Sequence, residues 1–531
     1  MRKILKVFGI IFLLLFQCAC TSKEETTSEY SIASEPITLD WYINYNWFVN
    51  DWGSNEVSKK ITEETGVSVN FITPIGSSEE KLNALINAND LPDILTLSWT
   101  EYQILTMIEN EMIYPLNELA NEYDTHFFEI ANPDVLKWYE QPDGNVYCYP
   151  NSVYTYEDFN NAKKNYSNQT FLVRKDIYEE IGSPDMSTTE GFYNAIKTVA
   201  QKYSSGSNED LIMVGATEFD EGGCDSFDVY LQNFLNIPYE KDGEFYDGNT
   251  DEEYIRWLKL FRKLCEENYI SKDIFVDQRP QISEKVAEGK YFCLLYQRTD
   301  IADQQKELFL NDPNRIYEAV EGPKNINGSS PALPTTGISG WTVTMISKKC
   351  KNPDIAIKFM DYLMSEHGQC LISLGVEGKT YDVIGDKAVM KPHIQQLLKT
   401  DRGTYDKNYG ADDTYWMLQN NTMQEKWMPE YEEPLLQMKL WTQPYAVYTG
   451  QYDMVRFNSS EEQMLYLENS RLWSDTLKKL LLSKCDEDFD KVLNEYREER
   501  EQIHFSDLQK IETAIMEQNK MLLGIDMEKN N

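Results

Sequence analysis

Strand-like and helix-like segments alternate from residue 38 onward, and this alternation restricts the fold more than any other feature. Apolar residues at helical spacing, and helix ends marked by Gly66 and by Leu91-Pro92, separate short β-type runs. The pattern predicts strands at residues 38–43, 67–71 and 93–97, and helices at residues 55–65 and 78–89. Repeated β–α–β units of this kind predict a largely parallel sheet with helices on its faces.

The middle of the chain continues the same pattern, and its end differs. Capping boxes at residues 187–190 and 250–253 precede amphipathic helices, and residues 241–244 form a hairpin-type turn. A further strand is expected at residues 340–347. From about residue 459 onward the sequence predicts only helices, with many charged faces. Hydrophobic residues make up 41% of the chain and aromatic residues 13%, which is enough to build a sizeable core.

The first 36 residues are expected to lie outside the fold. A basic start at Arg2, Lys3 and Lys6 precedes an apolar run of ten residues, which is too short to span a bilayer. This pattern is typical of a secretory signal peptide over residues 1–19. A small residue followed by Cys20 resembles a bacterial lipoprotein signal, in which Cys20 is acylated. Gln17 departs from that signal, and an ordinary cleaved signal is the alternative. Residues 20–36 then form a solvated tether.

Charge and motifs exclude several classes of protein. With 50 Lys and Arg against 88 Asp and Glu, the net charge is −38, which is unfavourable for binding a nucleic-acid backbone. Only four His are present, and the seven cysteines beyond Cys20 are scattered without a Cys-x-x-Cys pair, so no metal site is predicted. Free buried thiols or one or two disulfides remain open for these cysteines. The common metalloprotease, phosphate-binding, dinucleotide and hydrolase motifs are absent, so no cofactor is expected.

Several segments of the chain are specific enough for comparison with a known family. The most specific one ends in Gly-Val-Glu-Gly-Lys-Thr-Tyr at residues 375–381. The others are "KLNALINANDLPDILTL" (81–97), "NEMIYPLNELANEY" (110–123), "DGNVYCYPNSVY" (143–154), "FLVRKDIYEEIGSPDMSTTEGFYNAIK" (171–197) and "VAEGKYFCLLYQ" (286–297). Together they resemble the extracellular solute-binding proteins of family 1, in a long lipoprotein branch that binds sugars, and residues 286–297 resemble the return crossing between the lobes of that family.

The resemblance implies an α/β, two-lobed fold of the periplasmic-binding-protein type (type II). Lobe 1 would contain residues 37–150 and about 299–370. Lobe 2 would contain residues 151–298 and about 371–531, with the C-terminal helices, and hinge crossings would join the two lobes. The implied protein is a monomeric, non-enzymatic lipoprotein on the outer face of the cell membrane. It would bind a carbohydrate, expected to be an oligosaccharide, in the cleft and deliver it to the permease of an ABC importer.

Ligand-binding candidates follow from where the strands end, because open α/β sheets bind ligands at the carboxyl ends of their strands. Flat aromatic rings suit the apolar faces of a sugar, and carboxylate and amide groups suit its hydroxyls. Arg174 could bind an acidic group or form a structural salt bridge. The candidates are Asn44, Tyr45, Trp47, Trp99, Glu101, Asn151, Tyr154, Trp341, Asp412 and Trp416. Each Trp could instead pack in the core.

Two other functions compete with transport. A surface-anchored enzyme that degrades polysaccharides needs only two suitably placed carboxylates, and this chain is rich in them. A glycan adhesion module is the second alternative. The length of the resemblance, about residues 36–530, and the absence of internal repeats favour the transport component.

Overall fold

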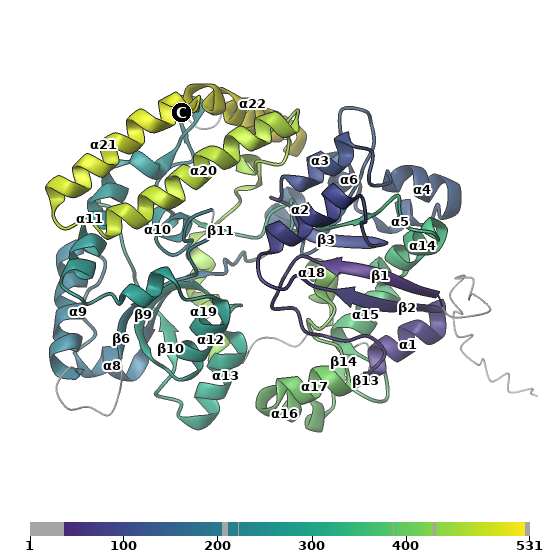
Figure 1. Cartoon of the computed structure of the whole chain (residues 1–531). Coiled ribbons are helices and arrows are strands. Elements are labelled where there is room, and N and C mark those ends of the chain that lie inside the picture. The colour runs from purple at the N-terminus through teal and green to yellow at the C-terminus, as the bar shows by residue number, and fades with distance from the viewer. Residues whose placement is uncertain (1–36, 204–210, 221, 386, 428–431, 526–531) are drawn as a thin grey trace, which may run out of the picture.

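The chain folds into two α/β lobes that lie side by side in a computed structural model (Figure 1). The structure describes residues 37–203, 211–220, 222–385, 387–427 and 432–525. The expected signal peptide and tether therefore lie outside the described residues. No helix within these ranges is long and apolar enough to cross a membrane.

Lobe 1 is built on a five-stranded sheet in the order β2-β1-β3-β12-β4, with helices on both faces. Its core joins the first part of the chain to residues 338–418. Its elements are β1 (Ile37–Ile43), α1 (Glu56–Thr65), β2 (Val67–Ile72), α2 (Ser78–Ala88), β3 (Ile94–Ser98), α3 (Gln103–Glu109), α4 (Leu116–Tyr123), α5 (Phe127–Ile130), α6 (Pro133–Tyr139), β4 (Tyr149–Pro150), β12 (Thr342–Ile346), α14 (Pro353–Met364), α15 (Glu366–Leu374), β13 (Tyr381–Ile384), β14 (Lys387–Met390), α16 (Pro392–Thr400), α17 (Arg402–Asn408), η3 (Trp416–Leu418) and α18 (Asn421–Gln424).

Lobe 2 is built on a four-stranded sheet in the order β10-β5-β9-β6. Helix α7 (Tyr156–Asn161) precedes it in the first crossing. Its elements are β5 (Gln169–Arg174), α8 (Lys175–Glu180), α9 (Thr189–Tyr203), β6 (Ile212–Gly215), α10 (Val229–Phe234), β7 (Glu240–Lys241), β8 (Glu244–Phe245), η1 (Gly248–Thr250), α11 (Glu252–Glu266), η2 (Lys272–Phe275), α12 (Arg279–Ala287), β9 (Tyr291–Gln297), α13 (Ala302–Asn311), β10 (Tyr317–Ala319), β11 (Leu333–Pro334), α19 (Leu435–Thr442), η4 (Gln443–Tyr445), β15 (Ala446–Val447), η5 (Gly450–Tyr452), α20 (Ser460–Leu481), α21 (Asp486–Gln502) and α22 (Phe505–Leu523).

The early β–α–β segments form as the sequence predicts. Asn55 caps α1 by accepting a hydrogen bond from the Ser58 amide, and Gly66 ends the helix in the left-handed conformation. Strands β1, β2 and β3 pair in parallel. The seven cysteines of the described chain are free thiols, which agrees with the first of the two readings of the sequence.

Neither sheet is parallel throughout, because strands next to the crossings run in the opposite direction. β12 starts at the edge where β3 ends and pairs with it antiparallel, so that Thr342 lies opposite Ser98. β5 likewise starts where β9 ends, with Gln169 opposite Gln297. A strand that enters a lobe from the hinge must run away from the cleft, whereas β1, β3, β6 and β9 run towards it. The sequence pattern predicted a largely parallel sheet and did not indicate these antiparallel strands, since the spacing of apolar residues carries no information on strand direction.

The lobe boundaries differ from the sequence-based expectation at two points. Residues 299–333 pack with lobe 2, because β10 pairs with β5 and its neighbours join the second core. Residues 371–418 pack with lobe 1, where Ile372, Tyr405 and Trp416 lie in the first core. The expected boundaries near 299 and 371 therefore move to about 334 and 419. The return crossing expected at residues 286–297 is not there, because β9 in this range is one of the two inner strands of the lobe 2 sheet.

Three crossings of the chain join the lobes, and hydrogen bonds tie them together. They lie between β4 and β5, between β11 and β12, and between η3 and α19. The first and second crossings meet where the Tyr154 amide donates to the Gly337 carbonyl at 3.1 Å. The first and third meet where the Ser152 amide donates to the Gln419 carbonyl at 2.9 Å. Strands β11 and β15 add a short parallel pair beside them.

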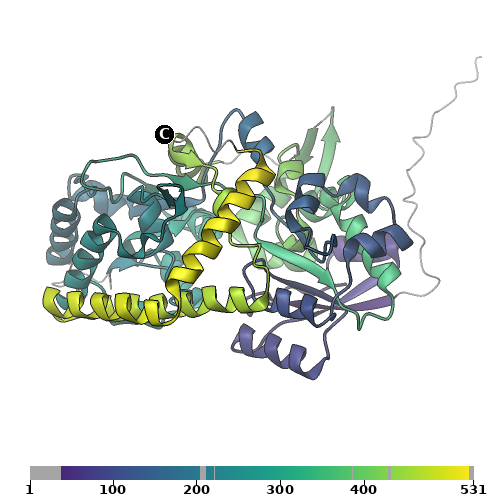
Figure 2. The ribbon, with the colours of Figure 1, turned by 90° about the horizontal axis from the view of Figure 1, so that it is seen from above.

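The C-terminal helices form one side of lobe 2 and reach the other lobe. Figure 2 shows α20 and α21 along the edge of lobe 2, with α22 running towards the middle of the molecule. Arg471 on α20 pairs with Glu79 on α2 at 2.8 Å. The Ser460 amide donates to the carboxylate of Glu109 on α3, also at 2.8 Å. The C-terminal part therefore limits how far the lobes can separate on this side.

Asp453 is a carboxylate held within the hinge region. It accepts a hydrogen bond of 2.6 Å from the Ser339 hydroxyl, and Trp138 of lobe 1 donates to the same hydroxyl at 3.0 Å. Burial raises the pKa of Asp453 to about 7, and the bond from Ser339 offsets this only in part. The charged form of Asp453 is therefore disfavoured in the folded protein.

We predict that Asp453→Asn flattens the pH dependence of stability. The folded state holds this proton more tightly than the unfolded chain, so the free energy of unfolding should fall as pH rises from about 4 to 7. Asn has no proton to lose, so the fall should be smaller in the variant. Urea unfolding at pH 4.5 and pH 8 measures it, with exposed Glu498→Gln as the control. An unchanged slope for Asp453→Asn would contradict the prediction.

Candidate binding site between the lobes

Four aromatic side chains, Tyr45, Trp47, Trp341 and Trp416, pack together where the sheet of lobe 1 meets lobe 2. We call them the aromatic platform. The rings of Trp47 and Trp341 are stacked, with centroids 6.1 Å apart and planes 4° from parallel. Trp341 lies 4.5 Å from Trp416 and 5.5 Å from Tyr45, measured between ring centroids. Such contacts hold each ring in place and leave it little freedom to reorient.

The platform has an exposed layer and a buried layer. Trp341 keeps 38% of its surface exposed, whereas Trp416 behind it keeps only 5%. Tyr45 and Trp47 are half-buried. The exposed ring of Trp341 therefore supplies the surface that a ligand can cover, and Trp416 supports it from the core.

The strand arrangement explains why residues so distant in sequence meet. Tyr45 and Trp47 follow the carboxyl end of β1, and Trp341 immediately precedes β12, which starts at the same edge. Gly340 has a φ of +69°, and a Cβ there would lie 2.1 Å from the Asn151 carbonyl oxygen. Only glycine suits this position, and it turns the chain so that Trp341 projects from the edge.

A polar group borders the platform on the lobe 1 side. The Asn44 side-chain amide donates to Glu101 at 3.0 Å, and the Tyr42 hydroxyl donates to Asn44 at 2.7 Å. Burial and the negative charge of Glu101 raise the pKa of Tyr45, which stays protonated and able to donate. Asn44 is buried and held in place, whereas Glu101 is only partly buried.

The opposite wall comes from lobe 2. The guanidinium of Arg279, at the start of α12, lies over the ring of Trp47 at 5.5 Å from its centroid. Arg279 also pairs with Asp300, which follows β9, at 3.1 Å. Burial would lower the pKa of Arg279, but Asp300, Tyr296 and Glu218 raise it, so the guanidinium stays charged. This is a direct contact between the aromatic platform and the second lobe.

Further carboxylates extend this wall. Asp225 accepts a hydrogen bond from the Tyr230 hydroxyl at 3.2 Å, and Gln297 donates to that hydroxyl at 2.7 Å. Desolvation by the surrounding protein raises the pKa of Asp225 to about 6, and the negative charges of Asp220, Glu218 and Asp300 add to the rise.

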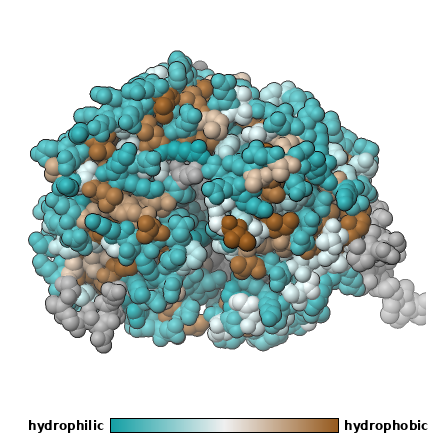
Figure 3. Space-filling view, viewed as in Figure 1, coloured by the Kyte–Doolittle hydropathy of each residue, from teal (hydrophilic) through white to brown (hydrophobic). Residues whose placement is uncertain are grey.

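The surface of the molecule is hollowed where the two lobes meet (Figure 3). Two small cavities inside lobe 2, one lined by Phe171 and Phe192 and the other by Ile212 and Tyr291, each have a volume of about 10 Å³. That volume holds about one water molecule, so neither of these two cavities has room for a sugar. In the described ranges no group of three His, Cys, Asp or Glu could hold a metal ion.

The structure brings six of the ten predicted site residues together, namely Asn44, Tyr45, Trp47, Glu101, Trp341 and Trp416. Trp99 lies partly buried at the end of β3, packed against the core of lobe 1. Whether it contacts a ligand stays a prediction.

Asn151 and Tyr154 lie in the first crossing, in structural positions. The side-chain NH₂ group of Asn151 donates to the Trp416 carbonyl at 2.9 Å, and its side-chain oxygen accepts from the Thr342 backbone amide at 2.8 Å. Its side chain is fully buried, so it has no free group to offer a ligand. The Tyr154 hydroxyl donates to Asn165 at 2.8 Å within the crossing. The Tyr154 side chain is only half-buried, so whether it contacts a ligand stays a prediction.

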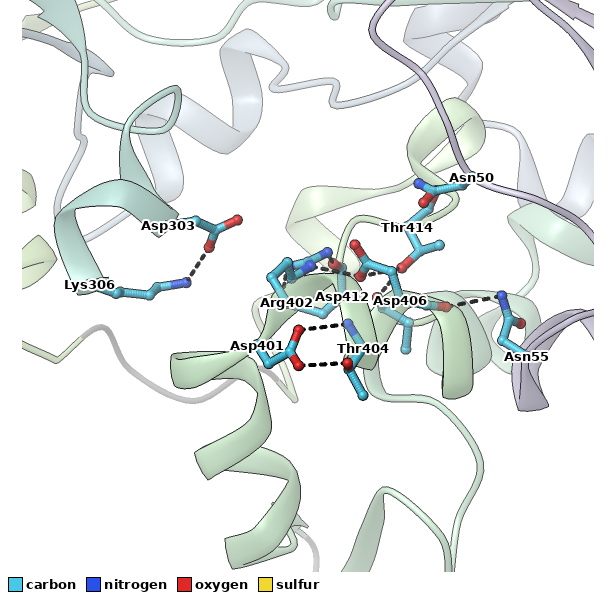
Figure 4. Close-up of polar contacts among 11 residues, drawn as sticks. Asn50, Asn55, Asp303, Lys306, Asp401, Arg402, Thr404, Asp406, Asp412 and Thr414 are labelled. Atoms are coloured by element: carbon cyan, nitrogen blue, oxygen red, sulfur yellow. Dashed lines mark hydrogen bonds and ion pairs between the residues drawn. The ribbon is translucent and has the colours of Figure 1, made fainter. Parts of the chain in front are cut away.

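Asp412 belongs to a separate charged group. It accepts a hydrogen bond of 2.8 Å from Arg402, which also pairs with Asp406 at 2.7 Å. Figure 4 shows Asp303 and Lys306 of α13, in lobe 2, on the other side of this group. Arg174 forms the structural salt bridge that was one of its two readings, with Asp176 at 2.8 Å. It stands at the end of β5, which points away from the cleft.

The lobe 2 side of the site was missed from the sequence. Arg279, Asp300, Glu218 and Asp225 were not among the candidates, although Glu218 and Asp300 follow the ends of β6 and β9. The rule that ligands bind at the carboxyl ends of strands would have found both. The end of β9 was not considered, because residues 286–297 were expected to form a crossing.

We predict that Asn151→Ala destabilises the fold. The change leaves the buried Thr342 amide and Trp416 carbonyl without this partner, at a cost of about 1–3 kcal/mol for an unsatisfied buried group. Denaturant unfolding measures the loss. Tyr154→Phe in the same crossing removes one half-buried hydroxyl and should cost less, about 1 kcal/mol. Equal effects of the two substitutions would argue against a special structural role for Asn151.

Comparison with known proteins places the chain among binding proteins. A family model described as bacterial extracellular solute-binding protein matches residues 56–373, more than half of the chain. Lipoprotein LipO of Bacillus subtilis (strain 168) is 23% identical over 338 residues, which cover 61% of this chain and 64% of LipO. The match therefore spans less than two thirds of that relative.

Two other relatives cover more of the chain. The polygalacturonan/rhamnogalacturonan-binding protein YtcQ of B. subtilis (strain 168) is 19% identical over 387 residues, covering 71% of this chain and 73% of YtcQ. The solved structure of the S. pneumoniae ABC-transporter substrate-binding protein FusA in complex with kestose has a TM-score of 0.70 at 17% identity. It covers 91% of this chain and 100% of that chain. This likeness confirms the expected two-lobed fold.

Proposed function

We propose that this chain, which belongs to the bacterial extracellular solute-binding proteins, binds an oligosaccharide between its lobes and delivers it to the permease of an ABC importer. The observation that carries the proposal is the aromatic platform with Arg279 of the other lobe over Trp47 at 5.5 Å. A ligand lying on the platform would touch both lobes at once. Its binding would then favour the closed arrangement, which the permease can recognise.

The chemistry of the two walls supports a sugar as the ligand. A pyranose or furanose ring has apolar C–H faces that stack on indole rings, and hydroxyls around its rim that need donors and acceptors. The exposed ring of Trp341 offers the apolar surface. Glu101, Asp300 and Asp225 offer acceptors, and Arg279 offers donors. Binding requires no covalent chemistry, so we propose a binding protein without catalytic activity.

The names of the relatives support a carbohydrate ligand and leave its type open. YtcQ is named for polygalacturonan and rhamnogalacturonan, and FusA for fructooligosaccharides. The first ligands carry acidic sugars and the second are uncharged. At identities of 19% and 20%, neither name transfers to this chain.

We further propose that Cys20 anchors the protein to the outer face of the cell membrane as a monomeric lipoprotein. The relative LipO carries the name lipoprotein. Acylation at Cys20 would leave the residues up to 36 as a tether, so that the lobes stand clear of the membrane surface. A net charge of −38 also favours the absence of nucleic-acid partners.

We expect Trp341→Ala to weaken oligosaccharide binding by tenfold or more. Loss of one stacking contact of about 1–2 kcal/mol corresponds to roughly that factor. A thermal-shift screen with mixed oligosaccharides identifies a ligand, and calorimetry then compares the wild type with the variant. The same samples are assayed for release of reducing sugar, since turnover would favour a polysaccharide-degrading enzyme over a binding protein.

The buried ring of Trp416 is the control for stability. Trp416→Ala should lower the free energy of unfolding by about 3–5 kcal/mol, as expected for a buried Trp, whereas Trp341→Ala should cost less because its ring is 38% exposed. A variant of Trp341 that retains full affinity and loses as much stability as Trp416→Ala would remove Trp341 from the site.

For the anchor, Cys20→Ser should release the protein from the membrane fraction into the medium or leave its signal peptide uncleaved. Two acyl chains give stable membrane residence, and Ser accepts no thioether-linked lipid. Cell fractionation and immunoblotting measure the distribution, with Cys18→Ser as the matched control. Unchanged membrane retention of Cys20→Ser would contradict the proposal.

A further inference from the structure

We propose that the cleft accepts uncharged oligosaccharides and excludes those whose sugars carry carboxylates. The inference rests on the proposed function and adds the chemical class of the ligand. Its basis is the set of charged side chains that the two lobes place around the aromatic platform.

Lobe 2 presents an excess of carboxylates to the platform. Asp300 pairs with Arg279 at 3.1 Å, and the negative charge of Glu218 also raises the pKa of Arg279. The charges of Glu218 and Asp300 likewise raise the pKa of Asp225, whose side chain accepts a hydrogen bond from Tyr230. Arg279 is the cation that lies over the platform, and its charge is already balanced by Asp300 at 3.1 Å. Once Asp300 balances Arg279, the carboxylates of Glu218 and Asp225 are left over, so the net charge of this wall is negative.

Lobe 1 adds negative charge of its own. Glu101 borders the platform through its hydrogen bond with Asn44. Further along the cleft, Arg402 is shared between Asp406 and Asp412. Asp413 follows Asp412 in the chain. Desolvation by the surrounding protein raises the pKa of Asp413 to about 6, and the negative charges of Asp412 and Asp303 add to the rise. The cations here are matched or outnumbered by acids (Figure 4).

The hydrogen-bonding roles of these carboxylates also favour an uncharged ligand. Ionised carboxylates only accept hydrogen bonds, so they suit sugar hydroxyls, which donate. A uronate group has no proton to donate at neutral pH, and it would meet Glu101, Glu218 or Asp225 with like charge in an enclosed space where water screens poorly. An acidic sugar would need an Arg whose charge is not already balanced by a carboxylate, and the charge of Arg279 is balanced by Asp300.

Matched ligand pairs test the inference on the full-length mature protein. Each pair is a uronate oligosaccharide and the same oligosaccharide with its carboxylates reduced to primary alcohols, made from polygalacturonate, polymannuronate and polyglucuronate fragments. Uncharged fructo-, gluco- and xylo-oligosaccharides complete the panel. We expect binding of at least one uncharged member, and at least tenfold weaker binding of every uronate than of its reduced partner.

Charge variants test whether the named carboxylates cause the discrimination. Glu218→Gln combined with Asp225→Asn should reduce the difference in binding affinity between the reduced and the uronate ligand by about tenfold. Glu498→Gln, on the exposed surface of α21 outside the cleft, should leave that difference unchanged. Raising the salt concentration from 0.05 to 1 M should also narrow the difference, because screening weakens like-charge repulsion. Circular dichroism of each variant checks that it folds.

The outcomes separate the inference from the proposed function. A uronate that binds as tightly as its reduced partner, or more tightly, overturns the inference and leaves oligosaccharide binding intact. A difference that neither salt nor the double variant reduces also overturns it, because charge would then not be the cause. If no saccharide of either kind binds, the proposed function fails and the inference fails with it.

Discussion

The hydrogen bonds of Asn151 hold together the parts of the chain on which the cleft depends. Its side-chain NH₂ group donates to the Trp416 carbonyl, and its side-chain oxygen accepts from the Thr342 amide at the start of β12. Its backbone oxygen accepts from the Trp341 amide at 3.3 Å. Two rings of the aromatic platform are therefore positioned by a residue of the hinge. A change at the hinge would reach the binding surface directly, since few flexible links lie between them.

Strand direction decides which residues face the cleft. Strands β1 and β3 deliver residues at their carboxyl ends, and β12 delivers Trp341 at its amino end, because it enters lobe 1 from a crossing. Lobe 2 repeats this arrangement with β6 and β9 running towards the cleft and β5 running away from it. Arg174, at the far end of β5, therefore serves a structural salt bridge, whereas Asp300, at the end of β9, faces the other lobe.

Local structure could be predicted from the sequence, and long-range pairing could not. Helix α1 and its neighbouring strands form where caps, Gly66 and periodicity indicate. Which residues belong to each lobe depends on which distant strands pair, such as β10 with β5, and no local sequence signal encodes that pairing. Tyr45 and Trp47 were predicted because they follow an early, clear strand. Arg279 was missed because it begins a helix, a position that by itself predicts only capping.

The two lobes contribute different chemistry to the cleft, and this difference bears on how a ligand could close it. Lobe 1 supplies stacked rings, whose attraction for a sugar face is short-ranged and depends on close contact. Lobe 2 supplies charged groups, whose hydrogen bonds depend on direction. A ligand could rest first on the rings with the lobes apart, because the platform is complete within lobe 1. Contacts with Arg279 and its neighbouring carboxylates then need the second lobe to approach. These contacts therefore stabilise the closed arrangement and do not contribute to the first encounter with the ligand.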